Sequence, residues 1–360
     1  MLGEIGSNFW IRPGEGSQGK QLGSPQQFGY EGSDYVWMST GRSATKLVLQ
    51  TIAERNKECK KVALLPSFTC HTVYDPFMEY GYDIHTLPLR LNLTTTVEEI
   101  LRYQEKCNAG VVLVHRYYGF DTLPGFNAVV ELLQNRGVVV IEDCTQCLYS
   151  SFPFSNADYV VASIRKWCGV PDGGFVICKE GSFHRKPFRT DTNMVEAKRI
   201  AAELKYQYLF EGKGDKPSFK AKYREAENLL DNQVDFFTIG TLSAAIQAEL
   251  DVELLRKKRR ANYGALLEGL QNKEGFQIIF NTLPDDVVPL YFPILIDNRE
   301  AWQDLLADND IYAPVVWPKA DNSPQIEEVA EKIYERILCI PIDQRYDVDD
   351  MQRIVDVINK

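Results

Sequence analysis

One stretch, from Val138 to Gly174, constrains the fold more than any other part of the sequence. It opens with an apolar, β-branched run that ends at Ile141, which is typical of a strand buried on both faces of a parallel sheet. A second apolar run, from Tyr159 to Ile164, predicts the next strand. Helices cover such sheets, and their binding sites lie at the carboxyl ends of the strands. The stretch therefore predicts an α/β fold.

Charged side chains follow both predicted strands. Glu142 and Asp143 end the first strand, and Lys166 comes just past the second, three residues after Ser163. Enzymes that use pyridoxal phosphate (PLP) hold it through a lysine amine and place a carboxylate at its ring nitrogen, so that the ring can accept electrons. Asp143 and Lys166 suit these roles. The alternative is a strand-end aspartate and a solvated lysine.

Length and charge exclude several classes of protein. At 360 residues the chain is long enough for two domains. The formal net charge of −10 argues against a general partner of nucleic acid or of an anionic membrane surface. No export signal or membrane-spanning apolar run is evident, so we expect a cytoplasmic protein whose partners are small molecules.

The cysteines and histidines indicate no metal site. Cys144 and Cys147 form a CxxC pattern, but a structural zinc site needs two more ligands at similar spacing, and none follows. A redox function for this pair stays open beside the simpler interpretation, two small side chains in a loop. The histidines are too scattered along the chain for a metal signature.

The chain order predicts three regions. Residues 1–35 are rich in Gly, Ser and Gln and predict an extended arm. Residues 36–249 predict a large α/β domain with a mixed, mostly parallel sheet, and residues 250–360 a small α+β domain. The long apolar pattern after Gly240 predicts one continuous helix as far as Leu270, and YAPVVW predicts a late strand.

A helix start near residue 41 suits a phosphate. Ser39, Thr40 and Gly41 form a turn before an amphipathic helix, which places Ser43 in its first turn. Free N–H groups and the positive end of the helix dipole lie there, and Arg42 adds a charge. An ordinary helix cap is the alternative. The sequence has neither GxGxxG nor GxxxxGK[ST], the patterns of dinucleotide and nucleotide sites.

Further motifs lie at the ends of other predicted strands. LPSFTCHTVYDP brings Phe68, Thr69, Cys70 and His71 to a strand end, where a ring can stack on a flat cofactor or belong to the core. VHRYYG places His115 at another strand end. Its plain interpretation is a satisfied core histidine.

In this order, TGRSA, LPSFTCHTVYDP, VHRYYG, the EDxxQ pattern of Glu142, Asp143 and Gln146, and Lys166 followed by Asp172-Gly173-Gly174 resemble motifs of one family. It is the DegT/DnrJ/StrS family of PLP-dependent sugar aminotransferases, which has the aspartate-aminotransferase fold (fold type I). The resemblance covers residues 36–360 and includes the carboxy-terminal tail from SAAIQAEL onward.

The resemblance implies roles for individual residues. Lys166 is implied to be the Schiff-base lysine and proton carrier, Asp143 the partner of the ring nitrogen, and Gln146 a contact on the ring's hydroxyl side. Other implied cofactor contacts are Gly41, Arg42, Ser43 and Ser163 around the phosphate, with Cys70 and His71 at the ring. His115 and Trp317 are candidate substrate contacts that packing explains equally well. The fold also implies a homodimer.

Three departures from the family pattern stand out. Ser163 lies three residues before the lysine instead of five. Cys70 occupies the place of the usual stacking aromatic, which leaves His71 or Phe68 as its substitute. FFTIG replaces the FNxRM-like segment through which a neighbouring subunit reaches the cofactor.

These observations lead to a main hypothesis and two alternatives. The main one is an aminotransferase that takes an amino group from glutamate and passes it to a keto acceptor, by resemblance a nucleotide-linked keto sugar. The second is a protein that keeps the fold but has a binding or regulatory role. The third is another PLP reaction, such as dehydration of a sugar, although the dehydratases of the family carry histidine in place of the lysine.

Overall fold

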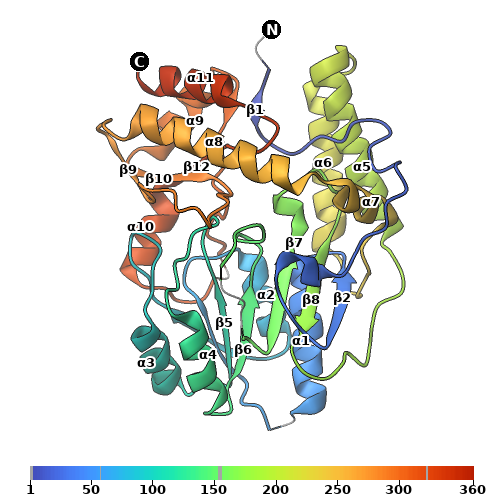
Figure 1. The fold of residues 1–360 in the computed structure, drawn as a ribbon, viewed down its shortest axis with the longest axis vertical. Helices are drawn as coiled ribbons and strands as arrows, with labels where there is room; N and C mark the ends of the chain where they lie inside the picture. Colours follow the sequence, from blue (N-terminus) through green and yellow to red (C-terminus); the bar gives the residue numbers. More distant parts are fainter. Residues whose placement is uncertain (1–2, 57, 153–155, 322) are drawn as a thin grey trace. The chain divides into compact units, whose positions relative to one another are not determined.

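The computed structural model describes residues 3–56, 58–152, 156–321 and 323–360 (Figure 1). These residues form two compact units that alternate along the chain. The first unit holds Gly3, residues 8–51 and residues 161–251, and the second holds the described parts of residues 4–7, 52–160 and 252–360. Helix α1 (Gly41–Arg55) and strand β7 (Tyr159–Ser163) each cross from one unit to the other. The predicted division at residues 35 and 249 stays a prediction.

The second unit contains a parallel sheet with the strand order β6-β5-β3-β4. Its strands and the helices that follow them are β3 (Val62–Pro66), α2 (His71–Glu79), β4 (Asp83–Leu87), α3 (Val97–Cys107), β5 (Val111–His115), α4 (Phe126–Gln134) and β6 (Val139–Asp143). Leu64, Val112 and Val140 are fully buried in one core cluster beneath α3 and α4. The alternation of strand and helix confirms the predicted α/β class.

The carboxy-terminal part of the second unit has two smaller sheets. Antiparallel strands follow the order β12-β10-β9, and β1 (Ile5–Gly6) pairs in parallel with β11 (Ile311–Tyr312). The remaining elements are α8 (Val252–Leu270), β9 (Phe276–Ile278), β10 (Phe292–Ile296), α9 (Arg299–Ala307), α10 (Glu328–Arg336), β12 (Ile337–Ile340) and α11 (Val348–Ile358).

The first unit combines an antiparallel strand pair with a long helical hairpin. Its elements besides the start of α1 and the end of β7 are η1 (Pro25–Phe28), β2 (Asp34–Met38), η2 (Ile164–Lys166), β8 (Gly174–Cys178), α5 (Thr192–Tyr206), η3 (Gln207–Glu211), α6 (Lys216–Asp231) and α7 (Thr241–Glu249). Strands β2 and β8 pair antiparallel along their whole length. Lys205 of α5 is fully buried and donates to the carbonyl of Asn8 at 2.6 Å, which fastens the amino-terminal arm to the hairpin.

Three expectations about elements are wrong in detail. The long helix is two helices, because Leu250 is extended (φ −60°, ψ 123°) and ends α7 before α8 begins. The strand expected at YAPVVW ends at Tyr312, since Pro314 lacks the N–H that a longer strand would need. The helix expected at IEEVAEKIYERI ends at Arg336, and its last expected residue, Ile337, instead begins β12, whose residues are all buried beside β10.

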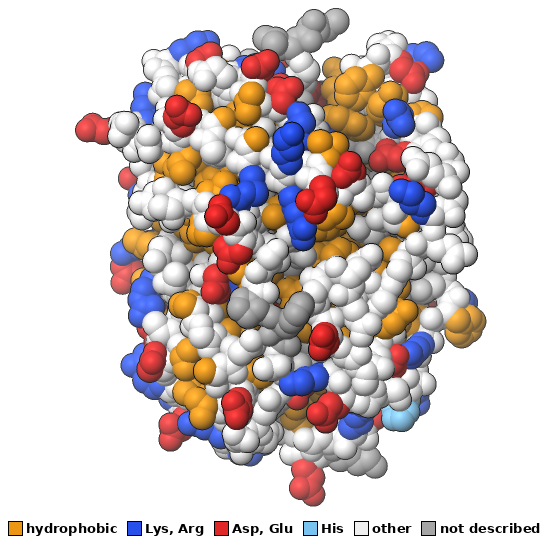
Figure 2. All heavy atoms as spheres, in the orientation of Figure 1, with side chains coloured by type: hydrophobic (Ala, Val, Ile, Leu, Met, Phe, Trp, Pro, Cys, Tyr) orange, Lys and Arg blue, Asp and Glu red, His pale blue; other side chains and the backbone are white. Residues whose placement is uncertain are grey.

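The surface carries both signs of charge. On the face in Figure 2, acidic and basic side chains are interspersed, with apolar side chains in small groups between them. Within the residues that the structure describes, no helix is both long and apolar enough to span a membrane.

Candidate active site

The start of α1, in the first unit, is capped by its own sequence. Thr40 Oγ1 accepts a hydrogen bond from the backbone N–H of Ser43 at 3.0 Å and donates to Ser43 Oγ at 3.0 Å. Ser39, Thr40 and Ser43 are all buried. This confirms that Ser43 lies in the first turn of a helix, whose N-terminal N–H groups suit an anion.

The Asp172-Gly173-Gly174 turn packs directly against this helix start. The N–H of Gly173 donates to the carbonyl of Ser39 at 2.6 Å, and its carbonyl accepts from the N–H of Ile164 at 3.2 Å. A Cβ on Gly174 would lie 2.6 Å from the carbonyl carbon of Thr40. Only glycine at position 174 lets the two backbones approach this closely.

Gly41 and Ser163 are neighbours in the first unit. A Cβ built on Gly41 would lie 3.5 Å from the Cβ of Ser163. Ser163 Oγ also donates to the carbonyl of Gly173 at 3.4 Å. The structure therefore brings three of the predicted phosphate contacts, Gly41, Ser43 and Ser163, to one corner.

Arg42 turns toward α6. Its Nη2 donates to the carbonyl of Leu230 at 2.9 Å and to Asp231 Oδ1 at 3.2 Å. The guanidinium thus satisfies the carboxyl end of α6, where a positive charge is favourable. In this arrangement Arg42 connects α1 to α6, and its predicted contact with a phosphate stays a prediction.

Lys166 ends η2, three residues after β7, and its side chain is exposed. Among the described residues no hydrogen bond or ion pair to its amine is present. Lys166 interacts electrostatically with Glu227 and Lys198 of the helical hairpin. The amine is therefore free to bond to a ligand.

Glu227 of α6 forms ion pairs with two neighbouring cations. Its Oε1 accepts from Arg165 at 3.2 Å and from the ammonium of Lys198. Desolvation by burial lowers the pKa of Lys198 to about 8, whereas Arg165 and Lys198 hold the pKa of Glu227 at about 2 despite its partial burial. Glu227 is thus ionised at neutral pH and balances part of the positive charge around Lys166.

Asp172 is a fully buried carboxyl in the same turn. It accepts from the N–H of Gly240 at 2.9 Å, just before α7, and its own N–H donates to Ser243 Oγ at 3.2 Å. Burial raises the pKa of Asp172 to about 6, and hydrogen bonds to its carboxyl from the Ser243 side chain and from the Gly240 N–H only partly oppose that rise. Asp172 therefore ties the turn after Lys166 to the start of α7.

In the second unit, His115 and Asp143 occupy paired positions at the carboxyl ends of the adjacent parallel strands β5 and β6. Asp143 accepts from the N–H of Thr145 at 2.9 Å, and no ion pair to it is present among the described residues. Desolvation by burial raises the pKa of Asp143. A cation placed against this carboxylate would offset much of the free-energy cost of desolvating its charge.

Gln146 lies in the loop after Asp143 and has only half of its amide bonded. Its Oε1 accepts from the backbone N–H of Tyr118 at 2.6 Å, while its buried Nε2 has no hydrogen-bond partner within the described structure. Buried donors are rarely left unpaired. This amide therefore has a donor available for a ligand.

The loop Pro66–His71 leads from β3 into α2. Cys70 is the N-cap residue of α2, and its Sγ lies 3.1 Å from Thr72 Oγ1. Cys70 and His71 are both partly exposed, whereas Phe68 is fully buried. Of the two stacking candidates, His71 is therefore the accessible one.

An aromatic cluster surrounds His115. The ring centroid of His115 lies 4.4 Å from that of Tyr117 and 5.5 Å from that of Trp317, and Phe68 packs on both aromatic neighbours. Trp317 is only 6% exposed. Desolvation lowers the pKa of His115 to about 3, so its ring is neutral. Both residues are therefore buried parts of the second unit. The two ring nitrogens of His115 have no hydrogen-bond partner within the described structure, so the expectation of a satisfied core histidine is not confirmed.

The predicted CxxC cysteines, Cys144 and Cys147, are both fully buried and reduced. Their burial favours the interpretation as small loop residues. Among the described residues no group of three or more His, Cys, Asp or Glu side chains is arranged to hold a metal ion.

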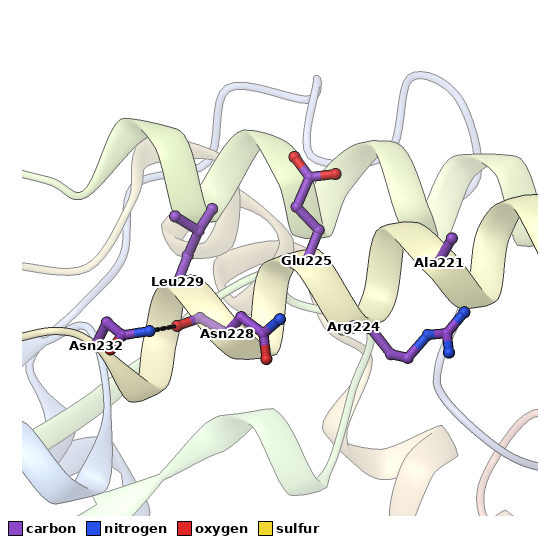
Figure 3. A pocket seen from close by; sticks show the side chains of 6 residues that line it. All are labelled: Ala221, Arg224, Glu225, Asn228, Leu229 and Asn232. Carbon is purple, nitrogen blue, oxygen red and sulfur yellow. Dashed lines mark hydrogen bonds between the residues drawn. The ribbon is translucent and has the colours of Figure 1, made fainter.

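A surface hollow of about 500 Å³ lies along α6 in the first unit (Figure 3). Its lining residues are Ala221, Arg224, Glu225, Asn228, Leu229 and Asn232. The Asn232 amide donates to the carbonyl of Asn228 at 2.7 Å, one helical turn earlier. None of the predicted site residues lines this hollow, so it is not part of the candidate active site.

Comparison with known proteins identifies the carboxy-terminal third of the chain. Residues 237–359 match the model of the DegT/DnrJ/EryC1/StrS aminotransferase family. This segment, about a third of the chain, is similar to that family. The family consists of aminotransferases, which are transferase enzymes. No protein of curated function matches the sequence.

Solved structures of aminotransferases share the fold along nearly the whole chain. The sugar aminotransferase CalS13 from Micromonospora echinospora is 16% identical, with a TM-score of 0.67, over 98% of this chain and 99% of that one. PseC from Helicobacter pylori, an aminotransferase involved in the biosynthesis of pseudoaminic acid, is 12% identical, with a TM-score of 0.69, over 100% and 98%.

A dehydratase has a similar fold. The E. coli GDP-4-keto-6-deoxy-D-mannose-3-dehydratase with bound hydrated PLP is 12% identical, with a TM-score of 0.66, over 99% of each chain. At these identities the likeness establishes the fold, and the predicted PLP-transferase fold is confirmed.

Thr69, which the sequence places in the same strand-end loop as Cys70 and His71, was given no role there. Thr69 is only 1% exposed, and its Oγ1 has no partner within the described structure. The signal in the sequence was its place beside Cys70 and His71 in a strand-end loop.

Proposed function

We propose that this protein is a PLP-dependent aminotransferase. It transfers an amino group from an amino acid, glutamate, to a keto acceptor, a nucleotide-linked keto sugar. The family match and the fold support the aminotransferase class. The sugar aminotransferases among the structural neighbours support the acceptor class. A homodimer and a cytoplasmic location remain predictions from the sequence.

The observation that carries the proposal is the pair formed by Asp143 and Gln146. A desolvated carboxylate without a cation and a buried amide without an acceptor lie three residues apart at one strand end. A protonated ring nitrogen would supply the cation, and a ring hydroxyl oxygen would supply the acceptor. The chemistry of the two side chains fits PLP.

Each predicted residue has a physical task in this proposal. PLP, when bound, supplies a ring that accepts the electrons released at the donor's α-carbon. Asp143 keeps the ring nitrogen protonated. Lys166, whose amine has no hydrogen bond among the described residues, would bond to the cofactor and, once displaced by the donor, move a proton to and from the reacting carbon.

The helix start in the first unit would hold the phosphate. Gly41 allows close approach of the backbone, and the N–H groups of the first turn of α1 attract an anion. The hydroxyls of Ser43 and Ser163 add donors at the same corner. Arg42 would have to leave Asp231 before it could contribute a charge.

A borohydride trap tests the proposal. PLP is added to the purified protein, the mixture is reduced with borohydride, and peptides are analysed by mass spectrometry. We expect the pyridoxyl mass on the peptide that contains Lys166, and none in Lys166→Ala. The matched control is Lys220→Ala, an exposed lysine of α6, which should label as the wild type does. Labelling spread equally over exposed lysines would contradict the proposal.

A dehydratase is the second candidate, because one neighbour in fold carries out that reaction. Lys166 speaks against it, since the dehydratases of the family carry histidine there. A protein with only a binding or regulatory role would retain PLP poorly and transfer no amino group. Product analysis with a keto sugar distinguishes the three: an amino sugar, a deoxy sugar or no product.

A further inference from the structure

Three tyrosine hydroxyls hold the loop Pro66–His71 in the second unit. Tyr74 donates to the carbonyl of Pro66 at 2.7 Å, Tyr117 to that of Phe68 at 2.6 Å, and Tyr334 to that of Thr69 at 2.8 Å. These tyrosines come from α2, from the loop after β5 and from α10. A short loop is thus fixed from three separate elements.

Tyr334 makes the tightest of these attachments, because it holds both backbone groups of one residue. The N–H of Thr69 donates to the Tyr334 hydroxyl at 3.0 Å, while that hydroxyl donates to the Thr69 carbonyl. Burial raises the pKa of Tyr334 to about 12, so the hydroxyl stays protonated and keeps both bonds. The backbone of Thr69 is fully occupied as a result.

A second contact from the same region supports the loop. Glu327, the N-cap residue of α10, accepts from Ser67 Oγ at 2.9 Å and from the N–H of Leu89 at 3.1 Å. The α10 region therefore fixes the loop at Ser67 and again at Thr69.

The side chain of Thr69, unlike its backbone, has a polar group without a hydrogen bond within the described structure. Its Oγ1 is buried and has no hydrogen-bond partner within the described structure. An unpaired buried hydroxyl is costly, so it needs an explanation such as a ligand atom. It lies immediately before Cys70 and His71, the predicted ring contacts.

We propose that Thr69 binds the cofactor through its hydroxyl and that Tyr334 is the positioning residue that aims it. This inference rests on the proposed function. The phenol of Tyr334 acts through the Thr69 backbone and touches no reacting atom. Its role is to keep the hydroxyl of Thr69 from rotating away with the loop.

The chain contains a matched control for Tyr334. Tyr346 is also a buried tyrosine of the second unit, and its hydroxyl likewise accepts from the N–H of Gly6 at 2.8 Å and donates to the Gly6 carbonyl at 3.2 Å. Tyr346→Phe and Tyr334→Phe therefore each remove a tyrosine hydroxyl that forms two hydrogen bonds with one residue's backbone, at different places in the second unit.

The experiment compares cofactor-free wild type, Thr69→Val, Tyr334→Phe and Tyr346→Phe. Melting temperature, amide hydrogen exchange at Thr69 and Cys70, and PLP affinity by titration are measured for each. We expect Thr69→Val to melt at or above the wild type, because an unpaired hydroxyl is removed, and to bind PLP about fivefold to tenfold more weakly. Tyr334→Phe should exchange these amides at least about tenfold faster and weaken PLP binding about threefold or more.

Tyr346→Phe should lower the melting temperature by about as much as Tyr334→Phe does. Its PLP affinity and the amide exchange at Thr69 and Cys70 should equal those of the wild type. The inference is overturned if Thr69→Val melts lower and binds PLP normally, or if Tyr334→Phe and Tyr346→Phe affect PLP alike. If the wild type binds no PLP, the proposed function itself is overturned. If the wild type binds PLP and the variants bind it equally well, only the roles of Thr69 and Tyr334 are overturned.

Discussion

Two desolvated carboxyls illustrate how residues near the candidate site differ. Asp143 accepts a backbone hydrogen bond but has no ion pair among the described residues, so no cation there compensates its negative charge. Asp172 accepts from the N–H of Gly240, and its role is to hold the turn after Lys166. Desolvation raises the pKa of both groups. Their expected responses to removal of the charge are opposite.

Asp143→Asn should weaken PLP binding and reduce turnover. The variant keeps the shape of the side chain but loses the charge that faces the ring nitrogen. A hydrogen bond to a charged group contributes about 1.5–3 kcal/mol, so we expect affinity to fall by about tenfold to a hundredfold. PLP titration of the cofactor-free protein measures this change. Glu131→Gln, an exposed acid on α4, serves as the control.

Asp172→Asn should be more stable than the wild type at pH 7. The folded pKa, about 6, lies above the ordinary value of 3.8, so the folded state binds the proton more tightly and stability declines as the pH rises from about 4 to about 6. Asparagine does not ionise, so the variant keeps the stability that the wild type loses on ionisation, which is up to about 3 kcal/mol at 1.36 kcal/mol per pKa unit. Unfolding by urea at pH 4 and pH 7 measures it. A variant less stable than the wild type by the same amount at both values would show that the ionised carboxylate is not costly.

At the scale of elements, close packing of backbones around α1 depends on glycine. A Cβ at Gly174 would lie 2.6 Å from Thr40 and from the Ala162 carbonyl. We expect Gly174→Ala to destabilise the protein by about 1–3 kcal/mol, because the backbone must shift to relieve the overlap. The shift should also weaken PLP binding through the displaced start of α1.

Gly264→Ala is the control for that substitution. Gly264 lies inside α8, and nothing lies within 4 Å of a Cβ built there. Alanine should therefore stabilise the helix by about 0.5–1 kcal/mol. Thermal unfolding of both variants measures the contrast. Equal effects at the two positions would contradict the packing account of Gly174.

Local signals predicted most elements well. Thr96 and Glu99 have the spacing of a capping box in the sequence, and that box is present at the start of α3, with Glu99 N–H donating to Thr96 Oγ1 and Thr96 N–H to Glu99 Oε2. The break between α7 and α8 could not be predicted, because Leu250 has a helical propensity and its extended conformation comes from tertiary structure. Residues Ile337–Ile340 likewise form a strand because β10 pairs with them.

At the scale of the whole molecule, the order of motifs predicted the fold, and a match to residues 237–359 together with similar structures confirmed it. The residues of the site were only partly predictable. Motif order indicates Lys166 and Asp143, but it carries no information on which polar atoms stay unpaired. Arg42 shows the difference, since only the structure places its guanidinium on the carboxyl end of α6. Thr69 is the converse case, because the sequence places it in the strand-end loop but only the structure shows that its buried hydroxyl is unpaired.

The central claim is that the chain transfers amino groups by way of PLP and Lys166. The most direct test mixes PLP-loaded protein with glutamate, without any acceptor, and measures 2-oxoglutarate by mass spectrometry. We predict an amount of 2-oxoglutarate equal to the bound cofactor from the wild type and none from Lys166→Ala. A wild type that holds PLP and releases no oxo acid from glutamate or any other amino acid would contradict the account.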